Sequence, residues 1–227
     1  MAPIDRYRRP QDLPDRIPVF PLRGAVLLPR AAMPLNIFEP RYLAMVDEAM
    51  SGARLIGIVQ PVDTGEDRES PLGKIADLRR VGCVGRITAY QELDDGRLLI
   101  TLTGVSRFGL VAEVPTDKPY RVWRVDAASY AGDLDRGRGE DLVDREKLLS
   151  VLKLYLDRRS LKADWRAIAG ASTEFLVNAL SVASPFGPEE KQALLEAPDL
   201  VRRAEVLIAL AEMEIASSEG GAGTTMQ

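Results

Sequence analysis

The chain of 227 residues contains no histidine and a single cysteine, Cys83. The absence of imidazole excludes Ser-His-Asp triads, HExxH zinc sites and histidine general bases. A lone cysteine without histidine also excludes Cys/His zinc sites and a Cys-His nucleophile pair. Cys83 cannot form an intrachain disulfide, which suits a reducing cytosol, and we expect it to be a small buried residue within a strand.

Nucleotide-binding loops and long apolar runs are missing as well. Gly73-Lys74 lacks both the upstream glycine and the following hydroxyl residue of a GxxxxGK[ST] loop, and no GxGxxG follows an expected strand. No apolar run approaches the roughly 20 residues of a membrane span. Residues 1–16 have no apolar core like that of a secretory signal. We therefore expect a cytoplasmic, bacterial-type protein with no cofactor, metal or membrane partner.

The net charge is −4, with 46% hydrophobic and 28% charged residues. These proportions are ordinary for a globular protein, and the length allows one large domain or two small ones. Nucleic-acid affinity comes largely from Lys and Arg that neutralise phosphates, so an acidic chain makes RNA binding a disfavoured alternative. A local basic patch stays open.

Acidic side chains could supply the acid and base of a hydrolase, and Asp94-Asp95 is the obvious pair. The run Asp94–Gly96 lies between two alternating strands, however, which favours a tight turn. Glu39 precedes Pro40 at an expected helix start, where the helix dipole favours a carboxylate. Ser150 has lysines at helical spacing, which a solvated helix face explains. We predict no catalytic residue, and an enzyme of unrecognised type remains an alternative.

The periodicity of apolar residues divides the chain into four parts. Residues 1–16 are polar and are predicted to form a flexible arm. Residues 17–131 have strand patterns, with one helix near 40–51. Residues 138–216 carry apolar side chains at helical spacing and are predicted to form a helical domain. Residues 217–227 are small and polar and are predicted to be disordered.

Within the β part, the clearest feature is the hairpin that turns at Asp94–Gly96. Gly104 and Gly109 predict bends or bulges in its return strand, and the polar stretch 63–74 predicts a loop. Prolines such as Pro34 cannot donate to a strand ladder and indicate edge strands. The order of strands and then helices predicts an α+β fold, with a mostly antiparallel β domain followed by a helical bundle.

Several short motifs follow one another in a recognisable order. They are the segments Ile17–Leu22, Ile37–Tyr42, Val81–Ile87, Leu93–Arg97, Gly104–Phe108, Pro119-Tyr120 and Lys191–Glu196. Together they resemble the N-terminal substrate-binding domain of Lon proteases over roughly 17–215, although Cys83 and Gly85 replace the family's usual Thr and Ala. No residue can be matched to the ATPase or to the Ser–Lys pair of the peptidase. The end of the chain resembles stand-alone bacterial Lon-substrate-binding-domain proteins, and a fragment of the protease is the alternative.

The resemblance implies a PUA-like antiparallel β pseudobarrel followed by helices. It also implies a non-catalytic module that binds unfolded or degron-bearing polypeptides. Three further possibilities stay open: an adaptor of a separate Lon protease, an RNA-binding PUA-like module and a homo-oligomer. The candidate polypeptide contacts are Met33, Pro34, Ile37, Phe38, Arg41, Tyr42, Arg107 and Phe108. The competing interpretation places Ile37, Phe38 and Phe108 in the core and uses Arg41 and Arg107 to tether loops or carboxylates.

Overall fold

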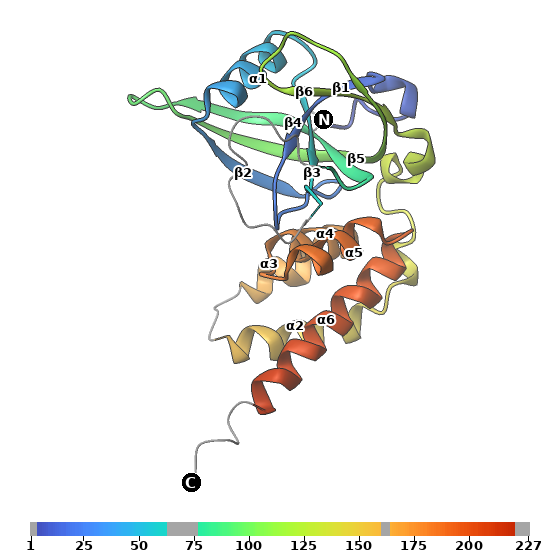
Figure 1. Ribbon diagram of the computed structural model, residues 1–227. Coiled ribbons are helices and arrows are strands. Elements are labelled where there is room, and N and C mark those ends of the chain that lie inside the picture. Colours follow the sequence, from blue (N-terminus) through green and yellow to red (C-terminus); the bar gives the residue numbers. More distant parts are fainter. Residues whose placement is uncertain (1–3, 63–76, 160–163, 221–227) are drawn as a thin grey trace.

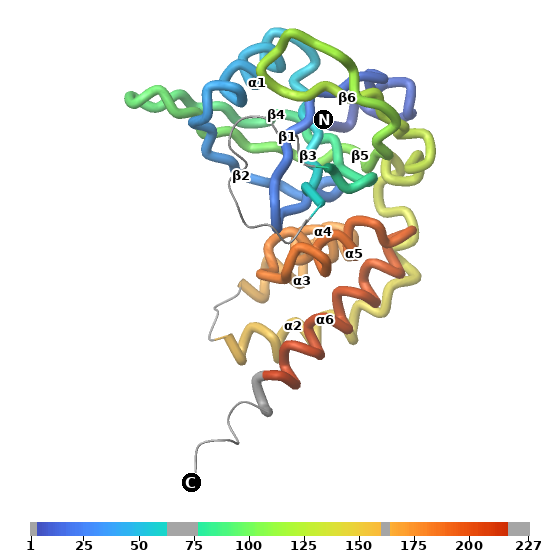
Figure 2. Tube along the Cα trace, in the orientation of Figure 1, coloured from blue at the N-terminus to red at the C-terminus, as the bar shows by residue number. Residues whose placement is uncertain are grey.

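A computed structural model describes residues 4–62, 77–159 and 164–220. A β domain is followed by a group of helices packed beneath it (Figure 1), and the chain runs from one part to the other between β6 and α2 (Figure 2). The predicted α+β fold is confirmed. The predicted loop at 63–74 and Gly73-Lys74 lie outside the described residues.

The β domain is one six-stranded sheet in the order β2-β5-β4-β3-β1-β6. Its strands are β1 (Arg16–Pro21), β2 (Ala32–Ile37), β3 (Leu55–Val59), β4 (Val81–Glu92), β5 (Leu98–Val114) and β6 (Arg121–Asp126). The sheet closes on itself because β6 pairs with both β1 and the second half of β5, whereas β2 pairs with the first half of β5. All pairings are antiparallel except that of β1 with β3, which is parallel.

The helical part contains α2 (Arg145–Arg158), α3 (Trp165–Gly170), α4 (Thr173–Ala183), α5 (Pro188–Glu196) and α6 (Leu200–Gly220). Helices α4 and α5 lie next to the barrel, while α2 and α6 pack together farther away (Figure 1). Short 3-10 turns connect the two parts at Ala128–Leu134 and Glu140–Leu142. Helix α6 includes residues 217–220 of the predicted tail, and the remainder of that tail, 221–227, lies outside the described residues.

The predicted turn and helix in the β domain are both present. Asp94–Gly96 closes the β4–β5 hairpin, with Gly96 at a φ of 82° and the Asp95 carboxylate accepting from the Arg97 amide at 3.2 Å. Helix α1 (Pro40–Ser51) begins with proline at its first position. Glu39 occupies the N-cap position, but its carboxylate accepts from Arg41 Nε at 2.9 Å instead of from a helix amide.

The segment before β1 is folded back onto the barrel. Residues Pro10–Asp12 form a 3-10 turn, and Tyr7 and Leu13 are buried in the same cluster as Ile17 and Val19. The prediction of a flexible arm is therefore wrong for the described residues 4–16. Three apolar side chains in this otherwise polar stretch, those of Ile4, Tyr7 and Leu13, pack on that cluster and anchor the segment.

A buried polar junction joins the barrel to the helices. Gln60 donates to the carbonyl of Pro188 at 2.9 Å and to the side chain of Gln192 at 3.1 Å. Asn178 on α4 donates to the carbonyl of Pro29 at 3.0 Å. These side chains are almost fully buried, so hydrogen bonds as well as apolar contacts hold the two parts together.

Lys191 in this junction carries its charge without a carboxylate partner among the described residues. Its Nζ donates to the carbonyl of Ser181 at 2.9 Å and to that of Val182, and both carbonyls lie in the last turn of α4. Burial lowers the pKa of Lys191 to about 8. The negative end of the α4 dipole offsets part of the cost of burying the ammonium group.

This shift makes the free energy of unfolding depend on pH. Between pH 8 and the ordinary lysine pKa of about 10.4, Lys191 is largely neutral in the folded chain and charged in the unfolded chain. The cost of burying its charge therefore decreases, and the free energy of unfolding increases, as pH rises. Lys191→Met has no such titrating group. We therefore expect the unfolding free energy of wild type, relative to that of Lys191→Met, to rise by about 1 kcal/mol from pH 7 to pH 9. Urea denaturation at both pH values measures it, and a difference independent of pH would contradict the assignment.

Candidate functional site

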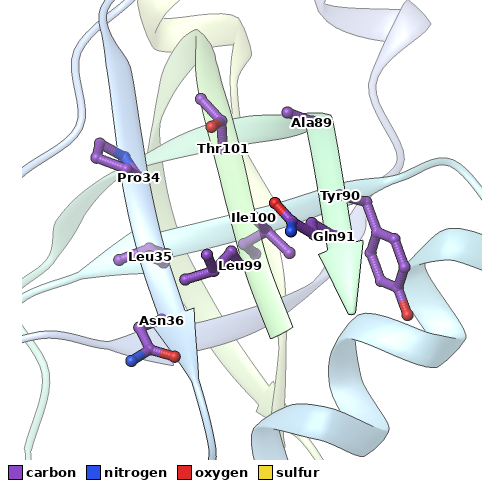
Figure 3. Close-up of a pocket in the computed structure, with 9 residues that line it drawn as sticks. All are labelled: Pro34, Leu35, Asn36, Ala89, Tyr90, Gln91, Leu99, Ile100 and Thr101. Carbon is purple, nitrogen blue, oxygen red and sulfur yellow. The ribbon is translucent and has the colours of Figure 1, made fainter. Parts of the chain in front are cut away.

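One patch on the sheet surface is exposed and carries no charged side chain. It is formed by Pro34 and Asn36 of β2, Leu99 and Thr101 of β5, and Ala89 and Gln91 of β4, which we call the uncharged face (Figure 3). These residues surround an open depression of about 510 Å³. In a chain that is 28% charged, six neighbouring outward side chains without a charge form a distinct surface.

The alternation of the three strands creates this face. Pro34, Thr101 and Ala89 lie opposite one another across the ladder, and the next level pairs Asn36 with Leu99 and Leu99 with Gln91. The intervening residues point to the other side, where Ile100 is buried in the core beneath α1 and Tyr90 points toward the helix (Figure 3). Burial of the apolar set therefore fixes the register and turns the uncharged set to solvent.

The outer edge of this surface is strand β2. Within the described residues β5 is its only strand partner, and Pro34 removes one backbone donor from the ladder. Exposure alternates along β2 and continues past its end to Phe38, which is 63% exposed. Phe38 therefore extends the surface with the largest exposed aromatic ring of the β domain.

Five of the predicted contact residues are buried. Met33 and Ile37 take the inward positions of β2, and Tyr42 stacks on Phe20 with ring centroids 4.1 Å apart. Phe108 fills the barrel interior, where a Cβ on Gly57 would lie only 2.9 Å from its ring. The expectation that these four side chains contact a ligand at the surface is thus wrong, and for Ile37 and Phe108 the competing core interpretation is confirmed.

Arg107 is the fifth buried candidate. It forms an ion pair with Asp133 at 2.8 Å. It also donates to the carbonyl of Leu195 in the last turn of α5 at 3.2 Å and to that of Pro198, beyond the end of the helix, at 3.3 Å. Its guanidinium also lies 4.8 Å from the ring centroid of Tyr130. Arg107 is only 3% exposed, so it cannot reach a ligand. It holds a carboxylate and a loop in place, as the competing interpretation stated.

Pro34, Phe38 and Arg41 remain accessible. Arg41 pairs with Glu39 at 2.6 Å and lies over the ring of Tyr42 at 4.7 Å, so its charge is already compensated. Pro34 and Phe38 belong to the uncharged face and its extension. The residues that sequence reasoning missed are Asn36, Ala89, Gln91, Leu99 and Thr101, although the alternation of the hairpin contained the signal that would have found the last two.

The chemistry available at this surface is limited to contact and hydrogen bonding. The amides of Asn36 and Gln91 can donate and accept, and Leu99 and Pro34 offer apolar area. Across residues 4–62, 77–159 and 164–220, no three His, Cys, Asp or Glu side chains gather as a metal site. Cys83 is fully buried, and burial raises the pKa of its thiol, which makes it a poor nucleophile. No helix among the described residues has both the length and the apolar character to cross a bilayer.

Comparison with known proteins adds a family to this description. Residues 16–212 match the family described as ATP-dependent protease La (LON) substrate-binding domain. The chain is 30% identical over 209 residues to a Lon protease of Parabacteroides distasonis, a match that covers 88% of the chain and 24% of that protein. It is 28% identical over 218 residues to Lon protease 2 of Myxococcus xanthus, covering 92% of the chain and 25% of that protein.

Two solved structures have a similar fold. A Lon N-terminal domain protein from Xanthomonas campestris superimposes with a TM-score of 0.60 at 24% identity, covering 86% of this chain and 97% of that one. The N-terminal domain of Lon protease from the Mycobacterium avium complex gives a TM-score of 0.62 at 20% identity, covering 87% and 98%. The chain spans about a quarter of the length of the Lon proteases that it matches.

Proposed function

The chain belongs to the LON substrate-binding domain family, and on that premise we propose that it binds unfolded or degron-bearing polypeptides through the uncharged face without transforming them. The observation that carries the proposal is the contiguous exposed set of Pro34, Asn36, Leu99 and their neighbours, extended by Phe38. The absence of histidine from the sequence and the burial of Cys83 support a non-catalytic role.

The composition of the face suits an unfolded chain. Unfolded polypeptides expose apolar side chains and unpaired backbone amides, which folded proteins bury or pair. Leu99 and Phe38 can cover apolar side chains, while Asn36 and Gln91 can pair with backbone groups. A surface without charge imposes little sequence selectivity, which is what a receptor for many different unfolded chains requires.

We further propose that the protein acts in the bacterial cytoplasm beside a Lon protease, either as an adaptor or as part of the same assembly. The support is the family match and its relatives, which are Lon proteases. The uncharged face offers no cation for phosphate, so it does not favour the alternative of RNA binding.

A titration tests the role of the uncharged face. We expect the double variant Phe38→Asp/Leu99→Asp to bind a permanently unfolded model protein at least about tenfold more weakly than wild type, because burying one large apolar side chain contributes about 1.5–3 kcal/mol. Fluorescence anisotropy with the labelled unfolded protein measures the dissociation constant. Both side chains are 40% or more exposed, so the substitutions leave the core intact.

The matched control places the same new charge elsewhere. Leu154 on α2 is 55% exposed and lies far from the sheet, so Leu154→Asp should bind like wild type. Equal loss of binding in the control and the double variant would show a nonspecific effect of charge. Dissociation constants of weak binding modules are on the order of 100 µM. If wild type does not bind the unfolded protein at about 100 µM, the proposed function itself is overturned.

A further inference from the structure

A second hollow lies beside α1. Its floor is apolar, formed by Met45 and Ala49 of α1 with Leu55, Tyr120 and Val122, and the loop from Val114 to Tyr120 makes one wall. The hollow measures about 450 Å³ and is open to solvent. Glu48 and Lys118 pair across one rim, and the Tyr120 hydroxyl donates to Glu48. We call this hollow the α1 groove.

Two arginines, Arg16 and Arg54, line the α1 groove, and a third, Arg124, lies beside Arg16. Arg16 of β1 is directly opposite Arg124 of β6, so both side chains point to the same face of the sheet. We call the set of Arg16, Arg54 and Arg124 the arginine row.

The charges of the arginine row are not compensated within the described protein. None of the three forms an ion pair with a described carboxylate, whereas Arg41, Arg97, Arg107 and Arg121 all do. Like charges directly opposite on neighbouring strands destabilise a sheet. Arg54 additionally has a φ of 61°, a left-handed conformation that costs a side-chain-bearing residue on the order of 1 kcal/mol. Three cations at one groove in a chain of net charge −4 are therefore available to an external anion.

We propose that the α1 groove binds an extended polypeptide segment whose apolar side chain enters the groove and whose neighbouring carboxylates meet the arginine row. This inference rests on the proposed function and names a subclass of its substrates: segments that combine apolar and acidic residues, or end in a carboxylate after an apolar residue. The apolar floor supplies contact area, and the guanidinium groups supply orientation through charge-assisted hydrogen bonds.

The groove fits a polypeptide better than a nucleic acid. Single-stranded nucleic acids need exposed aromatic faces for base stacking, but the ring of Tyr120 is only 6% exposed and its hydroxyl is occupied by Glu48.

Two labelled peptides of equal length test the inference. They share the same apolar residues, and three glutamates in one are replaced by three glutamines in the other. At low salt we expect the acidic peptide to bind wild type about tenfold more tightly, since three exposed ion pairs of about 0.5 kcal/mol each give that factor. The advantage should shrink as salt is added.

The discriminating variant is Arg16→Gln/Arg124→Gln. It should reduce the preference for the acidic peptide from about tenfold to about twofold, because only the ion pair with Arg54 remains. The melting temperature should be unchanged or raised, because the variant removes a like-charge pair. A merely structural role for these arginines would lower the melting temperature instead. Arg138→Gln/Arg202→Gln is the matched control: it removes two exposed positive charges elsewhere, and the preference should persist.

The remaining outcomes separate the two proposals. If wild type binds a permanently unfolded neutral polypeptide but shows no preference for the acidic peptide, the groove inference is overturned and the proposed function stands. If neither polypeptide binds, the proposed function fails. If a uridine oligonucleotide binds more tightly than the acidic peptide, and Arg16→Gln/Arg124→Gln removes that binding, the arginine row serves nucleic acid and the inference is wrong.

Discussion

Replacing Arg107 by alanine is expected to lower the free energy of unfolding by about 3–5 kcal/mol, as removal of one partner from a buried ion pair does. Arg107 Nε and Nη2 each donate to the Asp133 carboxylate at 2.8 Å, and the side chain of Arg107 is only 4% exposed. Its loss would leave the buried Asp133 carboxylate with the backbone amide of residue 107 as its remaining donor, and would remove the side-chain donor to the carbonyls of Leu195 and Pro198. Because those carbonyls lie at the C-terminal end of α5 and just beyond it, the same change should loosen the helices from the barrel.

Chemical denaturation of two further variants tests this expectation. Arg97→Ala in the hairpin turn removes an exposed ion pair with Asp95, and its cost should stay within about 0.5 kcal/mol. The double variant Arg107→Ala/Asp133→Ala should cost much less than the sum of the single changes, since each single change strands the other charge. Strict additivity would show that the two side chains do not stabilise the fold as a pair.

Replacing Gly104 by alanine is expected to destabilise the protein by about 3 kcal/mol or more, the upper range for overpacking a core. A Cβ at this position would lie 1.9 Å from the carbonyl oxygen of Leu28, and the obstacle is backbone, not a flexible side chain. The Gly104 amide also donates to the carbonyl of Ala31 at 2.9 Å, and its carbonyl accepts from Arg30 at 2.8 Å. The strand and the loop before β2 cannot separate without breaking these bonds.

Gly109 provides a control in the same strand. The nearest atom to a Cβ there is the carbonyl oxygen of Asp126 at 4.0 Å, which is ordinary contact. Gly109→Ala should therefore stay within about 1 kcal/mol of wild type, since alanine is preferred to glycine in a strand by roughly that amount. Thermal unfolding compares the two variants, and an equal effect at both positions would contradict the close approach of Leu28 to β5.

These two glycines also show how far the sequence predicted the fold. Both were predicted to mark bends or bulges in the return strand. The register of β5 shifts next to Gly104, between the pairs Val84–Ser106 and Gly85–Gly104, and again beyond Gly109, between Leu110 and Ala112. The alternating hairpin and Pro40 at the helix start were visible because they are local patterns. The parallel pairing of β1 with β3 was not, because it depends on how α1 returns the chain.

The candidate site was harder to predict for a related reason. Phe108 and Phe38 are identical in type and both belong to family motifs, yet one is 0% and the other 63% exposed. Burial of Phe108 depends on the space left by glycines on two other strands, which no local pattern encodes. The uncharged face likewise combines β2 with the β4–β5 hairpin, which is distant from it in sequence, and the arginine row requires the register of β1 with β6.

Site-specific photo-crosslinking tests the central claim most directly. The probe is p-benzoylphenylalanine, placed by the substitution Phe38→p-benzoylphenylalanine at the uncharged face and by Leu154→p-benzoylphenylalanine on α2, both at exposed positions. With a permanently unfolded neutral polypeptide, we predict crosslinks from the probe at 38, far fewer from the probe at 154, and none when the same polypeptide is folded. Equal crosslinking from both positions, or crosslinking of the folded form, would show that the uncharged face is not where unfolded chains bind.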